Sequence, residues 1–420
     1  MRIWVIKIGE QTPVKEANAT LGRVHFLCEE LVLSGHEVTW WTSTFSHQSK
    51  SFITKKDLEL EVKPGYTIKY LHSPKAYKKN VSIARLVHNY LGAKKLKKEL
   101  RKHTRPDLIL AAYPTIEMSL VATSYGQKHG VPVILDARDM WPDIFVEPLP
   151  TAWQPFLKLF LRPYFYMARK AFKSATAIFG ITEGFVNWGL RYANRERNTF
   201  DAAFPLAFNS THIDPQKIEA YKEKWTTLLP PNKKVVVYIG AFSRTKMDIP
   251  AITHLLEKVS ENERLYFLFC GNGDDSELIK EKISHFKNVH FHGWVSEEEG
   301  QAIMQLSSIG FAPYISKTDY CNSIPTKVIK YLSLGLPVLT SLKGDVEDLI
   351  KTHDCGLYYQ EETLDLAKNE LFSLTEDTDA GSARLSQTKQ NALTVYHEFF
   401  DAKKVYQKMV VKIEEIQKSN

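Results

Sequence analysis

Residues 321–341 read CNSIPTKVIKYLSLGLPVLTS, a loop, a short helix and a buried strand in close succession. We expect Asn322 or Ser323 to cap the first turn of this helix. Pro325 suits that first turn, and Gly335 fits just past the helix end. A helix that leads directly into an apolar strand is typical of parallel α/β sheets, so this stretch indicates that fold class.

The helix has two different sides. Its apolar positions Val328, Ile329 and Leu332 share one face, and Thr326 and Lys330 lie on another. The apolar face predicts packing against a sheet. Lys330 on the polar face is either a solvated surface lysine or a residue that faces a ligand.

The same alternation extends in both directions along the chain, and it predicts an α/β protein with two Rossmann-like doubly wound domains that face a cleft. We expect domains at 1–205 and 206–395, with a linker near 205–216 and a C-terminal helix over 396–420 that crosses back to the first domain. The predicted strands are 2–8, 36–43, 107–113, 132–138 and 175–182, then 233–242, 264–273, 289–294, 309–314 and 337–341.

Composition excludes several classes of protein. With 420 residues, 44% hydrophobic and 25% charged, the chain is globular and long enough for two cores. It has no secretory signal or membrane-spanning run, so we expect a cytoplasmic protein. The four cysteines and 14 histidines show no metal-binding spacing, and we expect no metal or other cofactor. Neither G-x-G-x-x-G nor a P-loop is present, which disfavours dehydrogenases and P-loop ATPases.

Positive charge is concentrated in residues 75–105, which hold eleven Lys or Arg and one acid, Glu99. This basic segment is either a solvated helix or a surface for anionic lipid. Nucleic acid is not an expected partner, because no nucleic-acid-binding motif accompanies the charge. The aromatic stretch 153–172 is either a membrane-docking segment or a pair of core helices interrupted at Pro163.

Six segments in order resemble the retaining GT-B glycosyltransferases of family GT4, of the type that assembles bacterial surface polysaccharides. They are GRVHFLCEELVLSGHEVTWWTSTFSH from residue 22, VPVILDARDMWPD from 131, VVVYIGAFSRTK from 235, FCGNGDD from 269, NVHFHGWVSEEE from 288 and SIPTKVIKYLSLGLPVL from 323. The resemblance covers nearly the whole chain. It implies a nucleotide diphosphate sugar as donor and a lipid-linked or oligosaccharide acceptor.

The resemblance also implies a donor site in the second domain. Lys246 occupies the family's phosphate-binding position after the Gly240 turn, with Arg244 as a second cation and Lys327 at the start of the opening helix. Cations and helix N-termini are the groups that stabilise a leaving diphosphate without a metal. For each lysine, a plain surface charge is the alternative.

Further positions carry roles that the resemblance implies. The loop from Gly293 to Val295 is similar to the segment that meets the nucleobase, and Gly271 and Gly273 would let the neighbouring loop approach closely. Ordinary turns are the alternative.

In the first domain Arg138 and Asp139 end a strand at the expected acceptor cleft and are the candidate catalytic residues. The alternative is a buried ion-pair group that includes Asp136.

The sequence departs from the family where it commonly has E-x7-E, because those two positions are Asn322 and Lys330. Lys330 cannot accept hydrogen bonds from ribose hydroxyls, which favours a deoxyribonucleotide donor or a loss of activity. Ala241 also replaces an arginine that the family often carries. We therefore expect a membrane-peripheral retaining glycosyltransferase, and keep two alternatives: a non-catalytic partner of the same fold and a sugar-nucleotide epimerase.

Overall fold

The computed structural model describes residues 1–14, 21–79, 82–208 and 214–419. The chain divides into two compact units. Unit 1 comprises Met1–Pro205 and Ala402–Asn420, and unit 2 comprises Leu206–Asp401. Residues 209–213 of the predicted linker lie outside the described residues.

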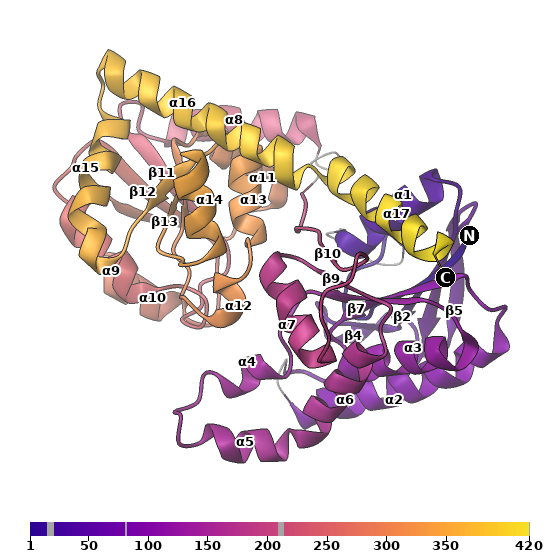
Figure 1. Cartoon of the computed structure of the whole chain (residues 1–420). Coiled ribbons are helices and arrows are strands. Elements are labelled where there is room, and N and C mark those ends of the chain that lie inside the picture. Colours follow the sequence, from indigo (N-terminus) through magenta and orange to yellow (C-terminus); the bar gives the residue numbers. More distant parts are fainter. Residues whose placement is uncertain (15–20, 80–81, 209–213, 420) are drawn as a thin grey trace. The chain divides into compact units, whose positions relative to one another are not determined.

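Unit 1 contains an eight-stranded sheet in the order β10-β9-β8-β7-β1-β2-β6-β5 (Figure 1). All neighbours are parallel except β5 and β6, which form an antiparallel pair at one edge that the strand predictions left out. The strands are β1 (Arg2–Ile6), β2 (Glu37–Ser43), β5 (Leu58–Lys63), β6 (Tyr66–Leu71), β7 (Leu108–Tyr113), β8 (Val133–Ala137), β9 (Ala177–Gly180) and β10 (Ala202–Ala203). A two-stranded ribbon, β3 (Phe45–Ser46) and β4 (Ser51–Phe52), follows β2.

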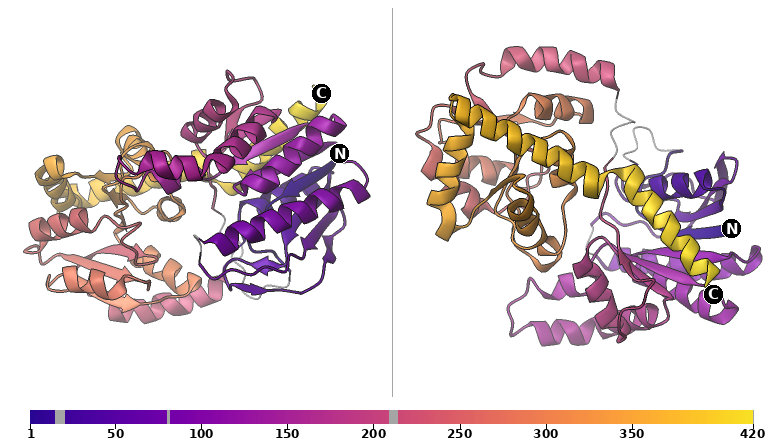
Figure 2. Two further views of the ribbon diagram at one scale, coloured as in Figure 1. Left: turned by 90° about the horizontal axis from the view of Figure 1, so that it is seen from below. Right: turned by 45° about the horizontal axis from the view of Figure 1, so that its top comes forward.

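Helices cover this sheet. The C-terminal helix α17 lies along α1 in the views of Figures 1 and 2, with the Phe26 and Tyr406 rings stacked 6.1 Å apart between centroids. On the other side α2 packs on α3, and α3 packs on α6. The helices are α1 (Arg23–Leu33), α2 (Ile83–Glu99), α3 (Ile116–His129), α4 (Asp143–Val146), α5 (Gln154–Phe160), α6 (Arg162–Lys173), α7 (Glu183–Ala193) and α17 (Ala402–Lys418).

The aromatic stretch 153–172 forms α5 and α6, which meet at Leu161. Only α6 belongs to the core, where it buries Phe165 and Phe172. The interpretation as a pair of core helices is therefore wrong for α5, none of whose residues is buried.

Unit 2 contains a six-stranded parallel sheet in the order β13-β12-β11-β14-β15-β16, with apolar cores on both faces. The strands are β11 (Lys234–Ile239), β12 (Leu265–Cys270), β13 (Val289–Gly293), β14 (Ile309–Ala312), β15 (Val338–Thr340) and β16 (Gly356–Tyr358). The helices are α8 (Pro215–Leu228), α9 (Ile249–Val259), α10 (Ser276–Ile283), α11 (Glu297–Leu306), α12 (Thr318–Cys321), α13 (Thr326–Ser333), α14 (Asp345–His353), α15 (Leu364–Thr375) and α16 (Asp379–Val395).

The last domain boundary lies between Asp401 and Ala402 rather than before residue 396. Residues 396–400 form a π-helical segment that stays with unit 2. Its Tyr396 hydroxyl donates to the carbonyl of Phe208 at 3.0 Å, and Phe400 is buried in the unit 2 core. These contacts hold the segment in unit 2, and the final helix begins after it.

The opening stretch forms α13 and β15, and the apolar face of α13 is buried as predicted. Gly335 adopts φ of +66° just after the helix, which confirms the C-terminal signal. The predicted cap is wrong, because Pro325 is the N-cap and has no side-chain acceptor. The Asn322 amide and the Ser323 hydroxyl instead donate to carbonyls of α12, at 2.7 Å and 3.2 Å, and so satisfy the end of that short helix.

Candidate functional site

The strand order of unit 2 reverses between β11 and β14, and ligands of such sheets bind beyond the carboxyl ends of the strands at this point. Three loops meet there. The Gly240 amide donates to Cys270 O at 3.0 Å, and the Gly271 amide donates to Gly293 O at 2.6 Å. A Cβ on Gly271 would lie 1.9 Å from Gly240 O, and one on Gly273 would lie 2.1 Å from Phe242 O. Only glycine permits this close approach, which leaves backbone exposed to a ligand.

Lys327 lies beside these loops in the first turn of α13. Its Nζ is 3.3 Å from the centroid of the Tyr238 ring and 5.4 Å from that of Tyr314. A Cβ on Gly240 would lie only 2.9 Å from the same Nζ. Burial, and then the charge of Lys246, lower the pKa of Lys327 well below its usual value. Among the described residues no anion contributes to this pKa, so an anion bound here would stabilise the ammonium.

Lys246 and Arg244 belong to the loop between β11 and α9, and both are exposed. Among the described residues, the Lys246 side chain makes no hydrogen bond or ion pair, although its charge reaches Lys327. Arg244 is held in place, because its Nε lies 3.3 Å from Asp275 Oδ1 and its amide donates to the same carboxylate. The charge of Lys246 is thus close enough to Lys327 to lower its pKa, whereas Arg244 is paired with Asp275.

The loop after β13 presents a different surface. Gly293 has φ of +94° and open space where a Cβ would lie. Val295 is buried in the unit 2 core, whereas the Trp294 indole is 71% exposed. Val295 therefore anchors the loop, and Trp294 is an aromatic surface that sequence reasoning did not single out.

Lys330 is not a solvated surface lysine, which was one of the two interpretations that the sequence allowed. It is 28% exposed, and its Nζ lies 2.6 Å from Glu297 Oε1 in the first turn of α11. The same Nζ is 4.9 Å from the centroid of the Phe208 ring. Glu297 was absent from the predicted site, because only the packing of α13 near α11 brings these two side chains together.

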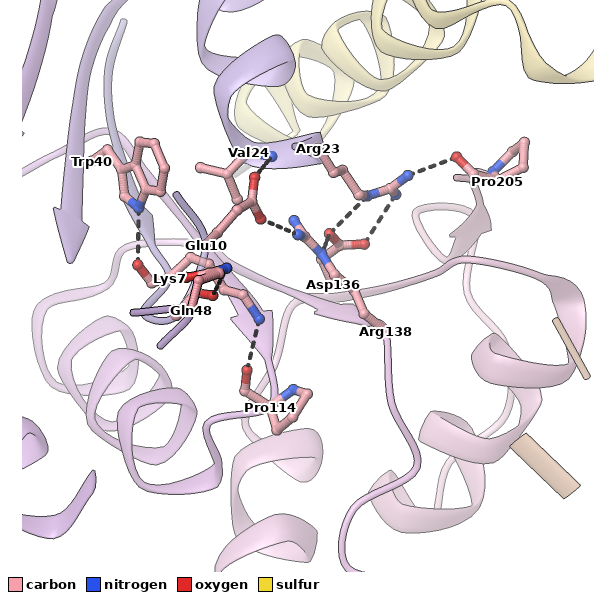
Figure 3. A network of polar contacts seen from close by, with 11 residues as sticks. Lys7, Glu10, Arg23, Val24, Trp40, Gln48, Pro114, Asp136, Arg138 and Pro205 are labelled. Carbon is pink, nitrogen blue, oxygen red and sulfur yellow. Dashed lines mark hydrogen bonds and ion pairs between the residues drawn. The ribbon is translucent and has the colours of Figure 1, made fainter. Parts of the chain in front are cut away.

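In unit 1 the candidate Arg138 belongs to a buried polar network (Figure 3). Asp136, at the end of β8, is fully buried and accepts from two guanidinium groups: Arg23 in α1, at 3.1 Å to each carboxylate oxygen, and Arg138, at 2.7 Å. Arg138 also donates to Glu10 at 3.0 Å. Burial would raise the pKa of Asp136, but the two arginines hold it well below the usual range. The ion pair that the alternative described is present between Asp136 and Arg138.

Asp139 is held differently. Its Oδ1 accepts from the Met140 amide and its Oδ2 from the Trp141 indole, each at 3.1 Å. The carboxylate is thus oriented by its own loop. Its catalytic role, like that of Arg138, stays a prediction.

Unit 1 also contains titratable groups that sequence reasoning missed. Burial, with a contribution from Arg138, lowers the pKa of Lys7 to about 8, and its Nζ donates to Pro114 O at 3.2 Å. Burial raises the pKa of Glu117, at the start of α3, to about 7. Lys7 directly follows β1, and Glu117 lies in the first turn of the helix after β7. Both therefore lie near the carboxyl ends of strands, which is the signal that could have marked them.

Within the described residues, no group of three or more His, Cys, Asp or Glu has an arrangement that could hold a metal ion. The helices of that same part of the chain are too short or too polar for any of them to cross a bilayer.

Comparisons with known proteins agree with this architecture. Residues 23–197 match the family model described as Glycosyltransferase Family 4, and residues 233–377 match the one described as Glycosyl transferases group 1. Together the two models span most of the chain, one in each unit. No curated protein matches the sequence.

Solved structures match over the full length, although sequence identity is low. Sucrose-phosphate synthase from Thermosynechococcus elongatus has a TM-score of 0.72 at 15% identity, with 100% of both chains covered. Anabaena HepE, in complex with UDP and glucose, has a TM-score of 0.63 at 13% identity, covering 99% of this chain and 100% of its own. WaaG, a glycosyltransferase involved in lipopolysaccharide biosynthesis, has a TM-score of 0.63 at 14% identity, with 98% of both chains covered.

These likenesses confirm the predicted fold class of two Rossmann-like domains. The two family models, one in each unit, and the shared architecture support a family 4 glycosyltransferase with the GT-B fold.

Proposed function

We propose that this protein transfers a sugar from a nucleotide diphosphate donor to a lipid-linked or polysaccharide acceptor with retention of configuration. The observation that carries the proposal is the grouping of Lys246 and Lys327 beside the glycine-rich loops of unit 2. A diphosphate leaving group develops negative charge, and two cations to which the described residues supply no paired anion are suited to stabilise it. The backbone next to Gly271 and Gly273 admits the phosphates closely.

In this reading the nucleoside extends from the phosphates over the loop after β13. The exposed Trp294 and the Gly293 backbone would contact the base, and Asn322 would contact the sugar. The acceptor hydroxyl attacks from the face that the diphosphate leaves, and a phosphate oxygen takes its proton. Asp139 of unit 1, oriented by Met140 and Trp141, would position the acceptor. No metal or other cofactor is required in this scheme, because lysines supply the positive charge.

Thermal-shift measurements against a panel of nucleoside diphosphates test the donor assignment. Relatives of the same fold contain UDP, UDP-glucose and ADP, so uridine and adenosine diphosphates lead the panel, with thymidine diphosphate beside them. A ligand at 100 times its Kd stabilises the folded state by about 2.7 kcal/mol. Stabilisation by one diphosphate, and less by its monophosphate, supports the proposal.

The absence of any nucleotide-dependent shift would contradict the donor assignment. Binding without turnover of the corresponding sugar nucleotides would favour the non-catalytic alternative. Conversion of the donor sugar without an acceptor would favour an epimerase.

We also propose that the protein docks on an anionic membrane through unit 1, where a lipid-linked acceptor would be found. The α5 surface, defined as Trp153, Phe156, Leu159 and Phe160, is 63–73% exposed although all four side chains are aromatic or aliphatic. Residues 153–173 hold five Lys or Arg and no acid. Aromatic side chains beside cations suit the interface of an anionic bilayer.

Helices α3 and α2, which pack in turn beside α6, add positive charge. A groove of about 380 Å³ is lined by apolar residues, among them Leu120, and by four cations: Lys97, Arg101, Lys128 and Lys170. Lys97 and Arg101 belong to the basic segment 75–105. The charge therefore continues from α5 and α6 to α2, as an anionic bilayer requires.

Flotation with phosphatidylglycerol and phosphatidylcholine vesicles tests this docking. We expect binding to phosphatidylglycerol at low salt, weakened at high salt by screening and by the double substitution Phe156→Glu and Phe160→Glu. The matched control is Leu228→Glu, a leucine on α8 of unit 2 that is 55% exposed. Equal flotation of all three proteins would contradict the α5 surface, and no flotation at low salt would contradict docking altogether.

A further inference from the structure

An open cavity of about 980 Å³ lies at the amino-terminal edge of the unit 1 sheet. It is bounded by the ends of α3, α6 and α7 and by the residues that precede β8 and β9. Helix α6 packs on both α3 and α7 (Figure 1). Ligands of parallel sheets bind at the carboxyl edge, where the candidates Arg138 and Asp139 follow β8. This amino-edge cavity is therefore separate from the acceptor site proposed for the same unit.

One face of α6 supplies the positive charge of the amino-edge cavity. Tyr166, Arg169, Lys170 and Lys173 follow the spacing of a single helix face, and all four are exposed and line the cavity. Among the described residues that line it, none is acidic. Within the same part of the chain, the side chains of the three cations form no ion pair or hydrogen bond. Their charge is thus available to a ligand.

The end of α6 accounts for only two of these cations. Lys170 and Lys173 belong to its last turn, where positive charge suits the partial negative charge of a helix C-terminus. Arg169 lies outside that turn. Its charge opposes the rise in pKa that burial and Asp143 cause in Tyr192, so Arg169 lies near Tyr192. Asp143 accepts from the Tyr192 hydroxyl at 2.9 Å and does not line the cavity.

The amino-edge cavity also offers neutral polar groups. The amides of Gln127 and Asn194 and the hydroxyl of Ser174 line it. Three helices end there, and the last carbonyls of a helix have no partner within that helix. The aliphatic lining residues are small, namely Val131, Pro132, Ala175 and Ala193. The cavity therefore provides many hydrogen-bonding groups and little surface for an acyl chain.

We propose that the amino-edge cavity binds an acidic oligosaccharide. The acidic groups of the sugar meet Arg169, Lys170 and Lys173, and its hydroxyls meet the amides and the helix-end carbonyls. An apolar sugar face packs on the Tyr166 ring. A lone phosphate would leave most of the volume empty, because a cavity of this size is at the upper end of the range for small-molecule sites, about 300–1,000 Å³.

In the proposed function, this ligand is a part of an acidic polysaccharide acceptor that lies far from its reacting end. That assignment rests on the proposed function, whereas binding of an acidic sugar is measured without any transfer reaction.

Calorimetric titration of the full chain with trigalacturonic acid tests the inference. Maltotriose, a neutral sugar with the same number of rings, inorganic phosphate and phosphatidylglycerol vesicles form the comparison arms. We expect trigalacturonic acid to bind about tenfold more tightly than maltotriose or phosphate. Because exposed charges are screened by salt, this binding should weaken at high ionic strength.

Tyr166 provides a local readout. In protein labelled with 3-fluorotyrosine, the fluorine resonance of Tyr166 is identified by Tyr166→Phe. We expect this resonance to shift on addition of trigalacturonic acid, since the ring lines the cavity. The absence of any shift would overturn the inference, and so would equal or tighter binding of maltotriose or phosphate.

Substitutions provide the second measurement. Arg169→Met and Lys173→Met should each weaken trigalacturonate binding about tenfold, as expected for loss of one charge-assisted contact, and Arg169→Lys should restore most of the affinity. Lys170 stays unchanged because it also lines the smaller groove assigned to the membrane. Lys408→Met removes an exposed lysine of α17 in the same unit and should have no effect. Melting temperatures report whether each variant is folded.

Equal trigalacturonate affinities in folded Arg169→Met, Lys173→Met and Lys408→Met would overturn the inference. If the first two variants instead lose flotation with phosphatidylglycerol vesicles and keep their trigalacturonate affinity, the cavity binds a lipid headgroup and the inference is wrong. The thermal shift produced by nucleoside diphosphates is independent of all these outcomes, so the donor assignment is tested separately.

Discussion

Removing the charge of Lys327 or Lys246 should weaken diphosphate binding far more than it weakens folding. Lys246 is exposed, so Lys246→Met should change the free energy of unfolding by no more than about 0.5 kcal/mol. Lys327→Met keeps a side chain of similar length against Tyr238. A charge-assisted contact contributes roughly 1.5–3 kcal/mol, so each variant should bind the nucleoside diphosphate roughly 10- to 150-fold more weakly. Affinity for the nucleoside itself should not change.

The lowered pKa of Lys327 adds a signature that surface lysines lack. A bound diphosphate raises this pKa again, so between the free and bound pKa values the protein takes up a proton on binding, and affinity falls as pH rises. Calorimetry in two buffers of different ionisation enthalpy measures the number of protons. We expect uptake of up to one proton in the wild type and in the control Lys287→Met, and almost none in Lys327→Met. Equal proton uptake in Lys327→Met and the wild type, or unchanged diphosphate affinity, would refute the assignment.

Four other outcomes follow from the geometry. Asp136→Asn should lower the free energy of unfolding, measured in urea, by about 3–5 kcal/mol, because it replaces the carboxylate shared by two buried arginines with a neutral amide. Gly271→Ala would place a Cβ at 1.9 Å from Gly240 O, so diphosphate binding by calorimetry should be lost even if the variant folds. Lys330→Glu should shift calorimetric preference from thymidine toward uridine diphosphate, since a carboxylate accepts from the ribose 2′-hydroxyl; the same ratio in both proteins would mean that Lys330 does not govern this choice. Glu117 has its pKa raised to about 7 in the folded state, so its contribution to stability is present below pH 4.5 and is lost by about pH 7, a decrease of about 3 kcal/mol; Glu117→Gln should remove that slope from urea titrations.

Much of the fold follows from local patterns in the sequence. Strands and helices of a parallel α/β sheet carry continuous apolar runs, amphipathic periods and glycine stops, and each of these signals depends on neighbours within a few residues. The end of α13 at Gly335 is such a signal, and its prediction was correct. The predicted N-cap of α13 was wrong because Asn322 and Ser323 lie between the ends of two helices. Only the structure shows that they donate to carbonyls of α12.

The sequence by itself determined the alternation of elements, the two-domain division and the positions of the glycines and lysines of the candidate donor site. Tertiary structure decided what those side chains meet: Lys330 is paired with Glu297, Lys327 lies against Tyr238, and α5 is exposed although it is as apolar as a core helix. These facts depend on contacts between residues far apart in the chain. Such contacts arise from packing, which no local pattern contains.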